Sequence, residues 1–453
     1  MGIDGNGMMM TRISRRRFLQ QSALSLGAVL EYPAFVSAAS PNSRLQVASI
    51  GVNGMGLTDV SEIGSHPKVR FVGFCDVDKN RFDKADAKFP GVPHFEDYRV
   101  MLAQLGDQCD AVSVSTPDHM HAPAALAAMR QRKHVFCQKP LAHTVWEIRQ
   151  MKLEAEKRGL TTQMGNQIHS AEAYRTAVRL LRDGIIGKIK EVHSYIGVHG
   201  RQHNNRTDRP PAAPVPDNLN WDQWIGPAPM RPYAADAYHP FKWRDWQDFG
   251  SGALGDFGCH ILDPIFTALG LTAPTSIRAE HDGTTPEVWP GPETVHYLFP
   301  STPFTVEKQV SVIWRDGGLL PPLDPAIFPA NFKLPKGGGG STIVGEGGTM
   351  LLPHWALPRL YPESKFSAFK SPKVTGLNHW HVWVDAVLAG KKTSDGFHYA
   401  GPLAETVQLG NVAARFPGQE LLWDTAAFKI TNKPEANPLL TKTYRPGWEV
   451  KPA

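Results

Sequence analysis

Residues 51–56, which read GVNGMG, lie between an apolar, β-prone run at 45–50 and a stretch with helical periodicity at 57–66. Glycines in such a turn permit positive φ angles and let the backbone approach a phosphate, whose charge the following helix N-terminus favours. Asn53 stands at the second glycine position of a G-x-G-x-x-G pattern, where asparagine tolerates positive φ better than most residues. The order strand, loop, helix predicts a dinucleotide-binding βα unit. The expected phosphate contacts are Gly51, Asn53, Gly54, Met55 and Gly56.

An acidic residue after the second predicted strand supports this interpretation. The loop alone would also suit a purely structural turn. Asp76 follows the run 69–75 and comes 25 residues after Gly51. A carboxylate at this point hydrogen-bonds the adenosine ribose hydroxyls and repels a 2′-phosphate, so it favours NAD over NADP. Asp76 could instead be a turn or helix-capping acid, a role that Asp78 could equally fill.

Strands and helices alternate up to about residue 166. Further strand candidates are 110–115, 134–137 and 160–164, and an alanine-rich helix is expected over 122–132. This alternation predicts βαβ units and a parallel sheet. Thr144 and Glu147 form a capping-box pattern at the start of another helix, which Gly159 ends. We therefore predict an N-terminal Rossmann domain over 44–166.

The order of the predicted elements changes after residue 166. β-like runs follow one another with few helices between them, at 189–198, 275–279, 294–299, 304–314 and 341–344. Helices are expected at 172–182, 252–267, 379–388 and 402–414, followed by an irregular tail. We predict an α/β protein: a doubly wound parallel Rossmann sheet, then an α+β domain over 167–453 with a large, mostly antiparallel sheet. The open face of such a sheet suggests a homodimer or homotetramer.

Charge is concentrated near the start of the chain. The 453 residues have a net charge of +5, and residues 11–20 read TRISRRRFLQ before an apolar stretch that ends in VSA. This pattern resembles a twin-arginine signal peptide over 1–38, which predicts export to the periplasm. Cleavage after Ala38 would leave 44 basic and 41 acidic side chains, a net charge of +3. No nucleic-acid partner is therefore expected. No apolar run is long enough for a membrane span, and four scattered cysteines lack zinc-site spacing.

Three more segments carry a family resemblance. They are TPDHMH at 116–121, CQKPL at 137–141 and GALGDFGCH at 252–260. With the glycine-rich loop, they resemble the Gfo/Idh/MocA oxidoreductases, the group that contains glucose–fructose oxidoreductase and inositol dehydrogenases. The similarity extends to 378–380 and 399–403, and the nearest look-alikes are secreted with twin-arginine leaders. The resemblance implies a nicotinamide cofactor and a sugar or polyol substrate.

The resemblance also implies roles for individual residues. Lys139 would lie between the nicotinamide ribose and the substrate and assist proton transfer, with Asp256 binding substrate or tuning the lysine and His260 as general base. Gln138 replaces the family's usual glutamate and removes a negative charge beside Lys139. The remaining cofactor contacts are expected at Thr116, Pro117, His121, Gln138, Lys139 and Asn166, and substrate contacts at Gln167, Trp243 and Arg244.

The chemistry of alcohol oxidation agrees with these roles. A hydride leaves to nicotinamide, and a proton goes to a base that should titrate near neutral pH, which suits histidine. On a helix, Asp256 and His260 are i,i+4 neighbours, and Asp263 could orient the ring of His260. The alternative is that Asp256 pairs locally and His260 is a core residue. A metal held by these three side chains lacks further ligands nearby, and no metal is predicted.

Three hypotheses follow. The first is an exported NAD(P)-dependent oxidoreductase that acts on a secondary hydroxyl of a sugar, glycoside or polyol with a tightly bound cofactor. The second is an NAD-dependent glycosidase that uses transient oxidation and elimination. The third is a non-catalytic sugar-binding relative, which the departures at Asn53 and Gln138 keep open.

Overall fold

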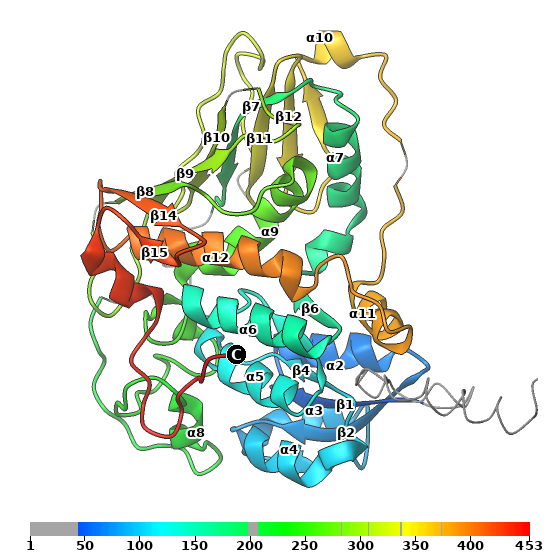
Figure 1. Ribbon diagram of the computed structural model, residues 1–453, viewed down its shortest axis with the longest axis vertical. Coiled ribbons are helices and arrows are strands. Elements are labelled where there is room, and N and C mark those ends of the chain that lie inside the picture. Colours follow the sequence, from blue (N-terminus) through cyan, green and yellow to red (C-terminus); the bar gives the residue numbers. More distant parts are fainter. Residues whose placement is uncertain (1–43, 198–206, 282, 307, 336–337, 373) are drawn as a thin grey trace, which may run out of the picture.

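The computed structural model describes residues 44–453 except 198–206, 282, 307, 336–337 and 373. The signal peptide expected at 1–38 lies outside the described residues. Two sheets lie one above the other, with helices between them (Figure 1). Within the described part of the chain, no helix is both long and apolar enough to cross a membrane.

The lower sheet has six strands in the order β3-β2-β1-β4-β5-β6, and every pairing is parallel. The strands are β1 (Leu45–Ile50), β2 (Val69–Cys75), β3 (His94–Phe95), β4 (Ala111–Val114), β5 (His134–Gln138) and β6 (Thr162–Gly165). The predicted Rossmann sheet is confirmed. Chain order reverses between β1 and β4, and their carboxyl ends therefore open the crevice in which such sheets bind ligands.

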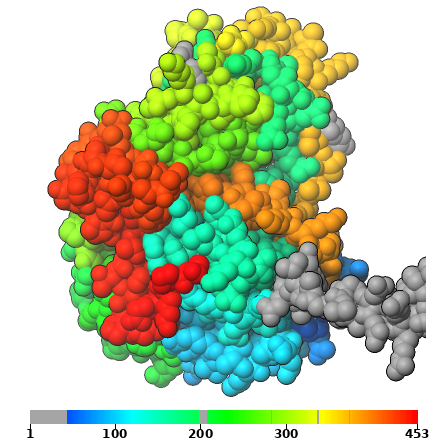
Figure 2. All heavy atoms as spheres, viewed as in Figure 1, coloured from blue at the N-terminus to red at the C-terminus, as the bar shows by residue number. Residues whose placement is uncertain are grey.

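Helices from distant parts of the chain complete this unit. Its own helices are α2 (Met55–Gly64), α3 (Asp83–Asp86), α4 (Tyr98–Leu105), α5 (His121–Arg130) and α6 (Val145–Arg158). Helix α11 (His379–Leu388) packs beside α2, where Trp383 and Val384 share a core with Leu45 and Phe136 (Figure 1). The C-terminal residues also cover the Rossmann helices (Figure 2), and the amide N–H of Ala453 donates to Gln150 Oε1 at 2.8 Å.

Half of the expected capping box at α6 forms. The hydroxyl of Thr144 accepts the amide N–H of Glu147 at 3.2 Å. The Glu147 carboxylate does not return to Thr144; it accepts a hydrogen bond from Tyr444 at 3.0 Å and pairs with Lys442 at 2.9 Å. The Glu147 carboxylate therefore binds the C-terminal segment instead of capping the start of α6.

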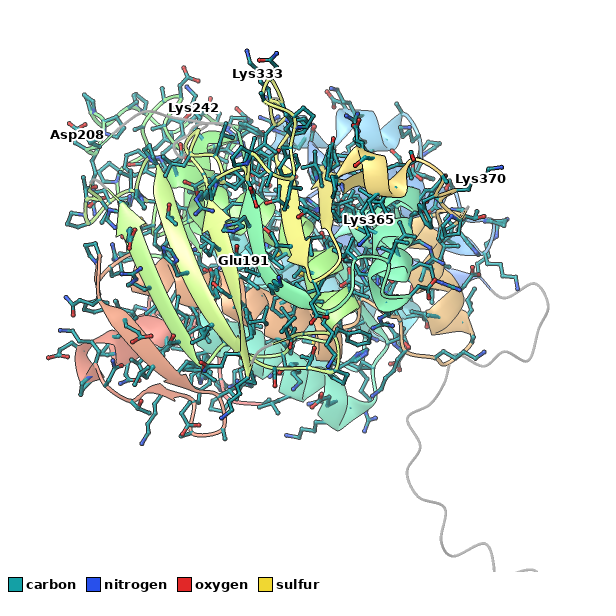
Figure 3. All side chains as sticks on the ribbon, turned by 90° about the horizontal axis from the view of Figure 1, so that it is seen from above. Glu191, Asp208, Lys242, Lys333, Lys365 and Lys370 are labelled. Atoms are coloured by element: carbon teal, nitrogen blue, oxygen red, sulfur yellow. The ribbon has the colours of Figure 1, made fainter. Side chains whose placement is uncertain are left out.

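The upper sheet has nine strands in the order β13-β12-β11-β7-β10-β9-β8-β14-β15. They are β7 (Ile189–Tyr195), β8 (Ser276–His281), β9 (Glu293–Pro300), β10 (Gln309–Arg315), β11 (Gly340–Gly345), β12 (Thr349–Pro353), β13 (Arg359–Tyr361), β14 (Glu420–Asp424) and β15 (Lys429–Ile430). Among these described strands only β7 and β10 pair in parallel, which confirms the mostly antiparallel prediction. Figure 3 looks onto this sheet, with Glu191 of β7 on it.

The expected irregular tail is wrong. Strands β14 and β15 come from it and extend the upper sheet: β14 pairs with β8, and β15 pairs with β14. The side chains of Leu421 and Trp423 alternate with exposed ones and pack into the core. Strands this short are stabilised mainly by the neighbour they pair with, so the local sequence indicates them weakly.

Three helices form the layer between the sheets. They are α7 (Glu172–Arg182), α9 (Gly252–Leu269) and α12 (Phe397–Ala413), and α12 contacts both α6 and α9. Helix α12 begins at Phe397, five residues before the expected start, with Pro402 inside it. Helix α9 brings the segment 252–260 over the carboxyl edge of the Rossmann sheet.

The turn after β1 makes a prediction about stability. A Cβ atom on Gly56 would lie 2.2 Å from the carbonyl oxygen of Gly51, which is backbone and cannot move aside. Gly56→Ala should lower the free energy of unfolding by about 1–3 kcal/mol, despite alanine's better helix propensity. Denaturant unfolding measures this. Gly291→Ala is the control, because a Cβ there meets nothing within 4 Å; equal stability of the two variants would contradict the steric argument.

Candidate active site

The glycine-rich turn has the conformation that phosphate binding requires. Gly51 and Gly54 have positive φ angles of 81° and 58°, and a Cβ on Gly51 would lie 2.5 Å from the carbonyl oxygen of Ser115. Asn53 is not among the positive-φ residues; its Oδ1 accepts the amide N–H of Gly54 at 2.7 Å. The expected need for a left-handed residue at position 53 is therefore wrong, and asparagine fits without strain.

A cavity of about 430 Å³ lies at the carboxyl edge of the Rossmann sheet, between the glycine-rich turn and helix α9. Most predicted site residues line it: Gly51, Asn53, Gly54, Met55, Asp76, Thr116, Pro117, Gln138, Lys139, Gln167, Trp243, Arg244, Asp256 and His260. Its size and mixed lining are typical of a small-molecule site. The fold thus brings together segments that are far apart in the sequence.

Three predicted cofactor contacts lie behind the cavity wall. Gly56 sits under the turn against Gly51. The ring nitrogens of His121 lie 2.8 Å from the carbonyl oxygen of Pro140 and 2.9 Å from that of Thr116. Asn166 donates from Nδ2 to the carbonyl oxygen of Cys259 at 3.3 Å. These residues position the loops and α9 from behind the wall.

Asp76 and Asp78 have different surroundings. The carboxylate of Asp76 accepts amide N–H groups of Val52 and Asp78, at 3.2 and 3.1 Å, and faces the cavity. Burial raises the pKa of Asp76 to about 6. Burial would also raise the pKa of Asp78, but hydrogen bonds from His239, Arg81 and Asn218 lower it to about 2. Asp78 is thus the structural acid, and Asp76 is the one presented to a ligand.

An ion pair connects the two domains across the cavity. The ammonium of Lys139, at the end of β5, donates to Asp256 Oδ1 at 2.6 Å and to the Asp256 carbonyl oxygen at 2.5 Å. Arg244 Nε lies 3.6 Å from the same carboxylate oxygen. The Arg244 guanidinium lies 4.3 Å from the ring centre of Trp243 and 4.4 Å from that of Phe241. Two cations therefore share one carboxylate.

His260 and Asp118 respond to burial in opposite directions. Burial, and next the charge of Lys139, lower the pKa of His260 well below 6.5, so its imidazole is neutral. Its Nδ1 has no hydrogen-bond partner among the described residues. Burial raises the pKa of Asp118 to about 7, partly offset by a hydrogen bond from Ser251 and the charge of Arg244. The expectation that His260 titrates near neutral pH is wrong; Asp118 does so instead.

Helix α9 forms as predicted and places Asp256 and His260 on the cavity wall. The expected contact from Asp263 to His260 is wrong. Asp263 turns to the other side, where it pairs with His169 Nδ1 at 3.0 Å and accepts the hydroxyl of Tyr399 at 2.6 Å. Spacing along a helix alone does not fix a side-chain contact. The tertiary neighbours His169 and Tyr399 bind Asp263 instead of His260.

The sequence comparisons identify the family. Residues 45–166 match the Gfo/Idh/MocA model described as an oxidoreductase family, NAD-binding Rossmann fold. Residues 176–289 match the model of the C-terminal alpha/beta domain of that family. The two matches together cover more than half of the chain. The chain belongs to the Gfo/Idh/MocA oxidoreductase family.

Curated relatives of this Gfo/Idh/MocA protein match part of it. The levoglucosan dehydrogenase of Pseudarthrobacter phenanthrenivorans is 27% identical over 34% of this chain and 31% of its own length. A glycosyl hydrolase family 109 protein of Shewanella putrefaciens is 29% identical over 32% of this chain and 33% of its own length. The chain thus spans about a third of the length of these relatives.

Solved structures share the fold over most of this chain. The WlbA dehydrogenase from Bordetella pertussis, in complex with NADH and UDP-GlcNAcA, has a TM-score of 0.59 at 16% identity. The match covers 84% of this chain and 99% of that one. The aldose-aldose oxidoreductase from Caulobacter crescentus, complexed with glycerol, has a TM-score of 0.57 at 16% identity, with 84% and 100% covered.

The departure from the Gfo/Idh/MocA pattern at Gln138 has a structural partner. Its Nε2 donates to both carboxylate oxygens of Asp59, at 3.0 and 2.9 Å. Asp59 also accepts the hydroxyl of Ser115 at 2.6 Å and the indole N–H of Trp380 at 2.8 Å. A glutamate at 138 would set two carboxylates against each other, which is unfavourable unless one is protonated. The side-chain amide of Gln138 therefore suits Asp59 on α2. The charge of Lys139 is balanced by Asp256 instead.

Sequence reasoning overlooked two groups near this site. Asp118 belongs to the TPDHMH segment, but no role was expected for its carboxylate, because its burial comes from the tertiary fold. His354, after β12, has its ring 5.7 Å from that of His260, and its Nδ1 lies 2.9 Å from the hydroxyl of Tyr174. Burial and then the charge of Lys139 lower the pKa of His354 to about 4. The TPDHMH motif gives no sign of the raised pKa of Asp118, and no motif includes His354.

The Asp76 carboxylate gives a testable pH dependence. Protonation removes an acceptor for ribose hydroxyls, so NAD affinity should fall as the pH is lowered through about 6. At pH 7.5, Asp76→Asn should weaken NAD binding about 10-fold or more, the value of a charge-assisted hydrogen bond, and should show little pH dependence near 6. Calorimetric titration measures both quantities. The exposed Asp107→Asn is the control; a wild-type affinity that stays constant from pH 5 to 7.5 would contradict the role of Asp76.

Proposed function

We propose that this protein oxidises or reduces a secondary hydroxyl of a sugar, glycoside or polyol with a tightly held nicotinamide cofactor. The observation that carries the proposal is one cavity that contains both the glycine-rich turn with Asp76 and the cluster of Lys139, Asp256 and His260. A nucleotide and an alcohol would lie end to end along it. The likeness to levoglucosan dehydrogenase supports a carbohydrate substrate.

The residues present fit the cofactor that the family implies. The positive φ of Gly51 and its close packing on Ser115 shape the turn after β1, and Asp76 presents an acceptor for ribose hydroxyls. Arg81, the cation beside them on the cavity wall, is paired with Asp78 at 2.8 Å. Because its charge is already engaged and Asp76 would repel a 2′-phosphate, we propose NAD rather than NADP.

The bound nicotinamide would accept or supply the hydride, and the chain's own groups handle the proton. The Lys139 ammonium, held by Asp256, stabilises negative charge on the reacting oxygen. The neutral imidazole of His260 accepts the hydroxyl proton. Asp118, with a pKa of about 7, exchanges that proton with solvent at neutral pH. The departures at Asn53 and Gln138 leave this machinery formed, which weighs against a non-catalytic relative.

A second candidate function is NAD-dependent glycoside cleavage. The similarity to a glycosyl hydrolase family 109 protein favours it. Transient oxidation would acidify a neighbouring C–H bond and permit elimination followed by hydration, with the same lysine and histidine. In this case no net change in the redox state of the cofactor accompanies product formation.

One assay separates the two candidates. The purified protein is incubated with a panel of free sugars, polyols and synthetic glycosides, while the nicotinamide absorbance and the products are followed together. Reduced cofactor in step with an oxidised sugar supports the oxidoreductase. Released aglycone with unchanged absorbance supports the glycosidase. Neither change with any compound, with NAD bound, would contradict both.

We also propose export by the twin-arginine route. The support is the segment SRRRFL at 14–19, followed by an apolar stretch and small residues. This route carries folded proteins, so the cofactor would be loaded before export and remain bound. Mass spectrometry of the nucleotide released from protein recovered outside the cytoplasm tests this; a mature chain found only in the cytoplasm would contradict export.

Lys139→Ala should abolish turnover while NAD binding persists. Removing the ammonium leaves charge on the reacting oxygen without a cation, and a loss in kcat of about 100-fold or more is expected. NAD retention should stay within about twofold of wild type. Lys370→Ala, at an exposed position (Figure 3), is the control. Near-normal turnover of the Lys139 variant would dismiss the proposed site.

Asp118 should determine the pH profile near neutrality. In the oxidation direction the carboxylate form takes up the released proton, so kcat/KM should rise as the pH passes upward through about 7. Asp118→Asn should lower the rate and remove this inflection. His260 cannot produce it, because its pKa lies well below 6.5. An inflection that survives in the asparagine variant would exclude Asp118 as its source.

A further inference from the structure

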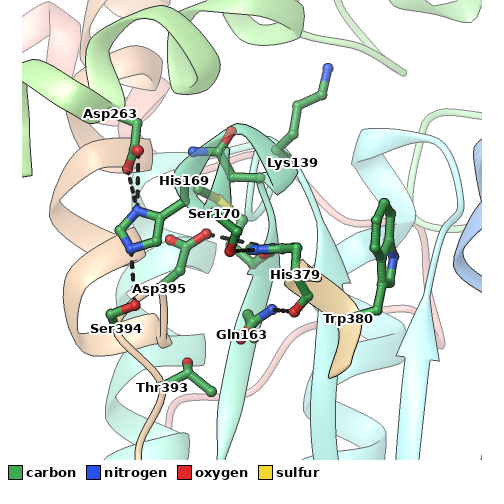
Figure 4. Close-up of polar contacts among 12 residues, drawn as sticks. Lys139, Gln163, His169, Ser170, Asp263, His379, Trp380, Thr393, Ser394 and Asp395 are labelled. Atoms are coloured by element: carbon green, nitrogen blue, oxygen red, sulfur yellow. Dashed lines mark hydrogen bonds and ion pairs between the residues drawn. The ribbon is translucent and has the colours of Figure 1, made fainter. Parts of the chain in front are cut away.

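Three potential metal ligands converge behind the proposed active site. They are His169, in the short helix Gln167–Ser170 after β6; Asp263, in α9; and Asp395, just before α12. One ligand atom from each lies within 4.8 Å of the other two. Figure 4 shows both carboxylates directed toward the His169 ring, with the Lys139 ammonium pointing away from them.

The cluster has outer partners of the kind that orient metal ligands. His169 Nδ1 lies 3.0 and 3.1 Å from the two oxygens of Asp263, and its Nε2 lies 3.0 Å from the hydroxyl of Ser394. Nδ1 faces Asp263 and is the nitrogen that would bind a metal ion once its proton is released, while Nε2 stays held by Ser394. Tyr399 donates to Asp263 Oδ1 at 2.6 Å. A ligating histidine held through its other nitrogen is the usual arrangement at metal sites.

Asp395 supplies an independent observation. It is 1% exposed, and within the described residues neither carboxylate oxygen has a hydrogen-bond partner. The nearest basic nitrogen, Nε2 of His379, lies 3.9 Å away and already contacts the carbonyl oxygen of Met164 at 2.8 Å. A buried carboxylate without hydrogen bonds is strongly unfavourable unless a cation meets it. The His169 ring, within 4.8 Å, faces this carboxylate without a hydrogen bond to it, and a metal ion between the three side chains would give Asp395 a direct contact.

We propose that His169, Asp263 and Asp395 bind a divalent cation of the Zn²⁺ or Mn²⁺ type. One imidazole nitrogen with two carboxylates suits these ions, since Mg²⁺ and Ca²⁺ prefer oxygen ligands alone. Burial would lower the pKa of His169, but the charges of Asp263 and Asp395 raise it to about 9, so without an ion this imidazole carries a proton. A divalent ion would displace that proton, and the two carboxylates would balance its charge. This set differs from the one considered on α9, because two of its members come from other parts of the chain.

The position of the cluster indicates a structural role. None of the three ligands is among the cavity-lining residues, so the ion would not touch substrate. Asp263 lies on the same helix as Asp256 and His260, while His169 follows Gln167, which does line the cavity. The ion would fasten α9 to the end of the Rossmann sheet and so set the distance between Lys139 and its partners on α9.

Metal content tests the proposal independently of activity. Untagged full-length protein, purified without chelator, should contain about one zinc or manganese per chain by plasma mass spectrometry. After treatment with EDTA its melting temperature should fall, and added ZnCl₂ or MnCl₂ should restore it. Asp395→Asn should hold less than about a tenth of an equivalent and show no restoration. The control is Asp385→Asn, an exposed carboxylate outside the cluster, which should bind as wild type does.

A proton on His169, which is ion-paired with Asp263, is the competing explanation, and the same experiment distinguishes it. If wild type contains no metal and added zinc or manganese leaves its melting temperature unchanged, the cluster holds a proton and the proposal is overturned. Equal metal in wild type and Asp395→Asn would overturn it as well. Should the asparagine variant fail to fold, His169→Gln replaces it, with the same loss of metal expected.

Discussion

The ion pair between Lys139 and Asp256 joins the end of β5 to helix α9, and the cavity is arranged around it. Both side chains are mostly buried, with 15% and 17% exposed, so their charges act at short range with little screening by water. Arg244 adds a second cation to the same carboxylate. Two cations thus share one carboxylate at this end of the cavity, an arrangement that favours a developing oxyanion there.

Burial and these charges explain why the titratable groups around the ion pair behave differently. Burial, and next the charge of Lys139, lower the pKa of His260 and of His354, so both imidazoles are held neutral. For Asp118, burial outweighs the attraction of Arg244 and Lys139, and its pKa settles near 7. His260 is a weak base, and Asp118 has a pKa near neutrality. Neither group binds a proton strongly at neutral pH, which suits the proton exchange proposed for them.

The sequence predicted those features of the fold and site that depend on local patterns. The GVNGMG turn and the alternation of strands and helices predicted the Rossmann sheet, and the spacing of Asp256 and His260 predicted that one helix presents both. What it missed depends on tertiary contact. The partner of Gln138 is Asp59, and the partner of Asp263 is His169; both pairs join residues that are far apart in the sequence. Strand β14 likewise depends on its pairing with β8. The raised pKa of Asp118 depends on burial, which no motif reveals.

Gln138 shows how a departure from a family pattern should be interpreted. Considered alone, the loss of a glutamate beside Lys139 removes a charge and weakens the case for catalysis. In the structure, Asp59 carries a carboxylate directly beneath position 138, and burial raises its pKa to about 6 despite hydrogen bonds from Ser115, Trp380 and Gln138. Glutamine supplies the donors that this acid needs, whereas glutamate would compete with it. The acid of this layer is therefore Asp59 on α2 and not residue 138 on β5. Trp380 of α11 donates a hydrogen bond to it. The substitution and the returning helix belong to one network, and the motif cannot be judged without the segment that folds back onto it.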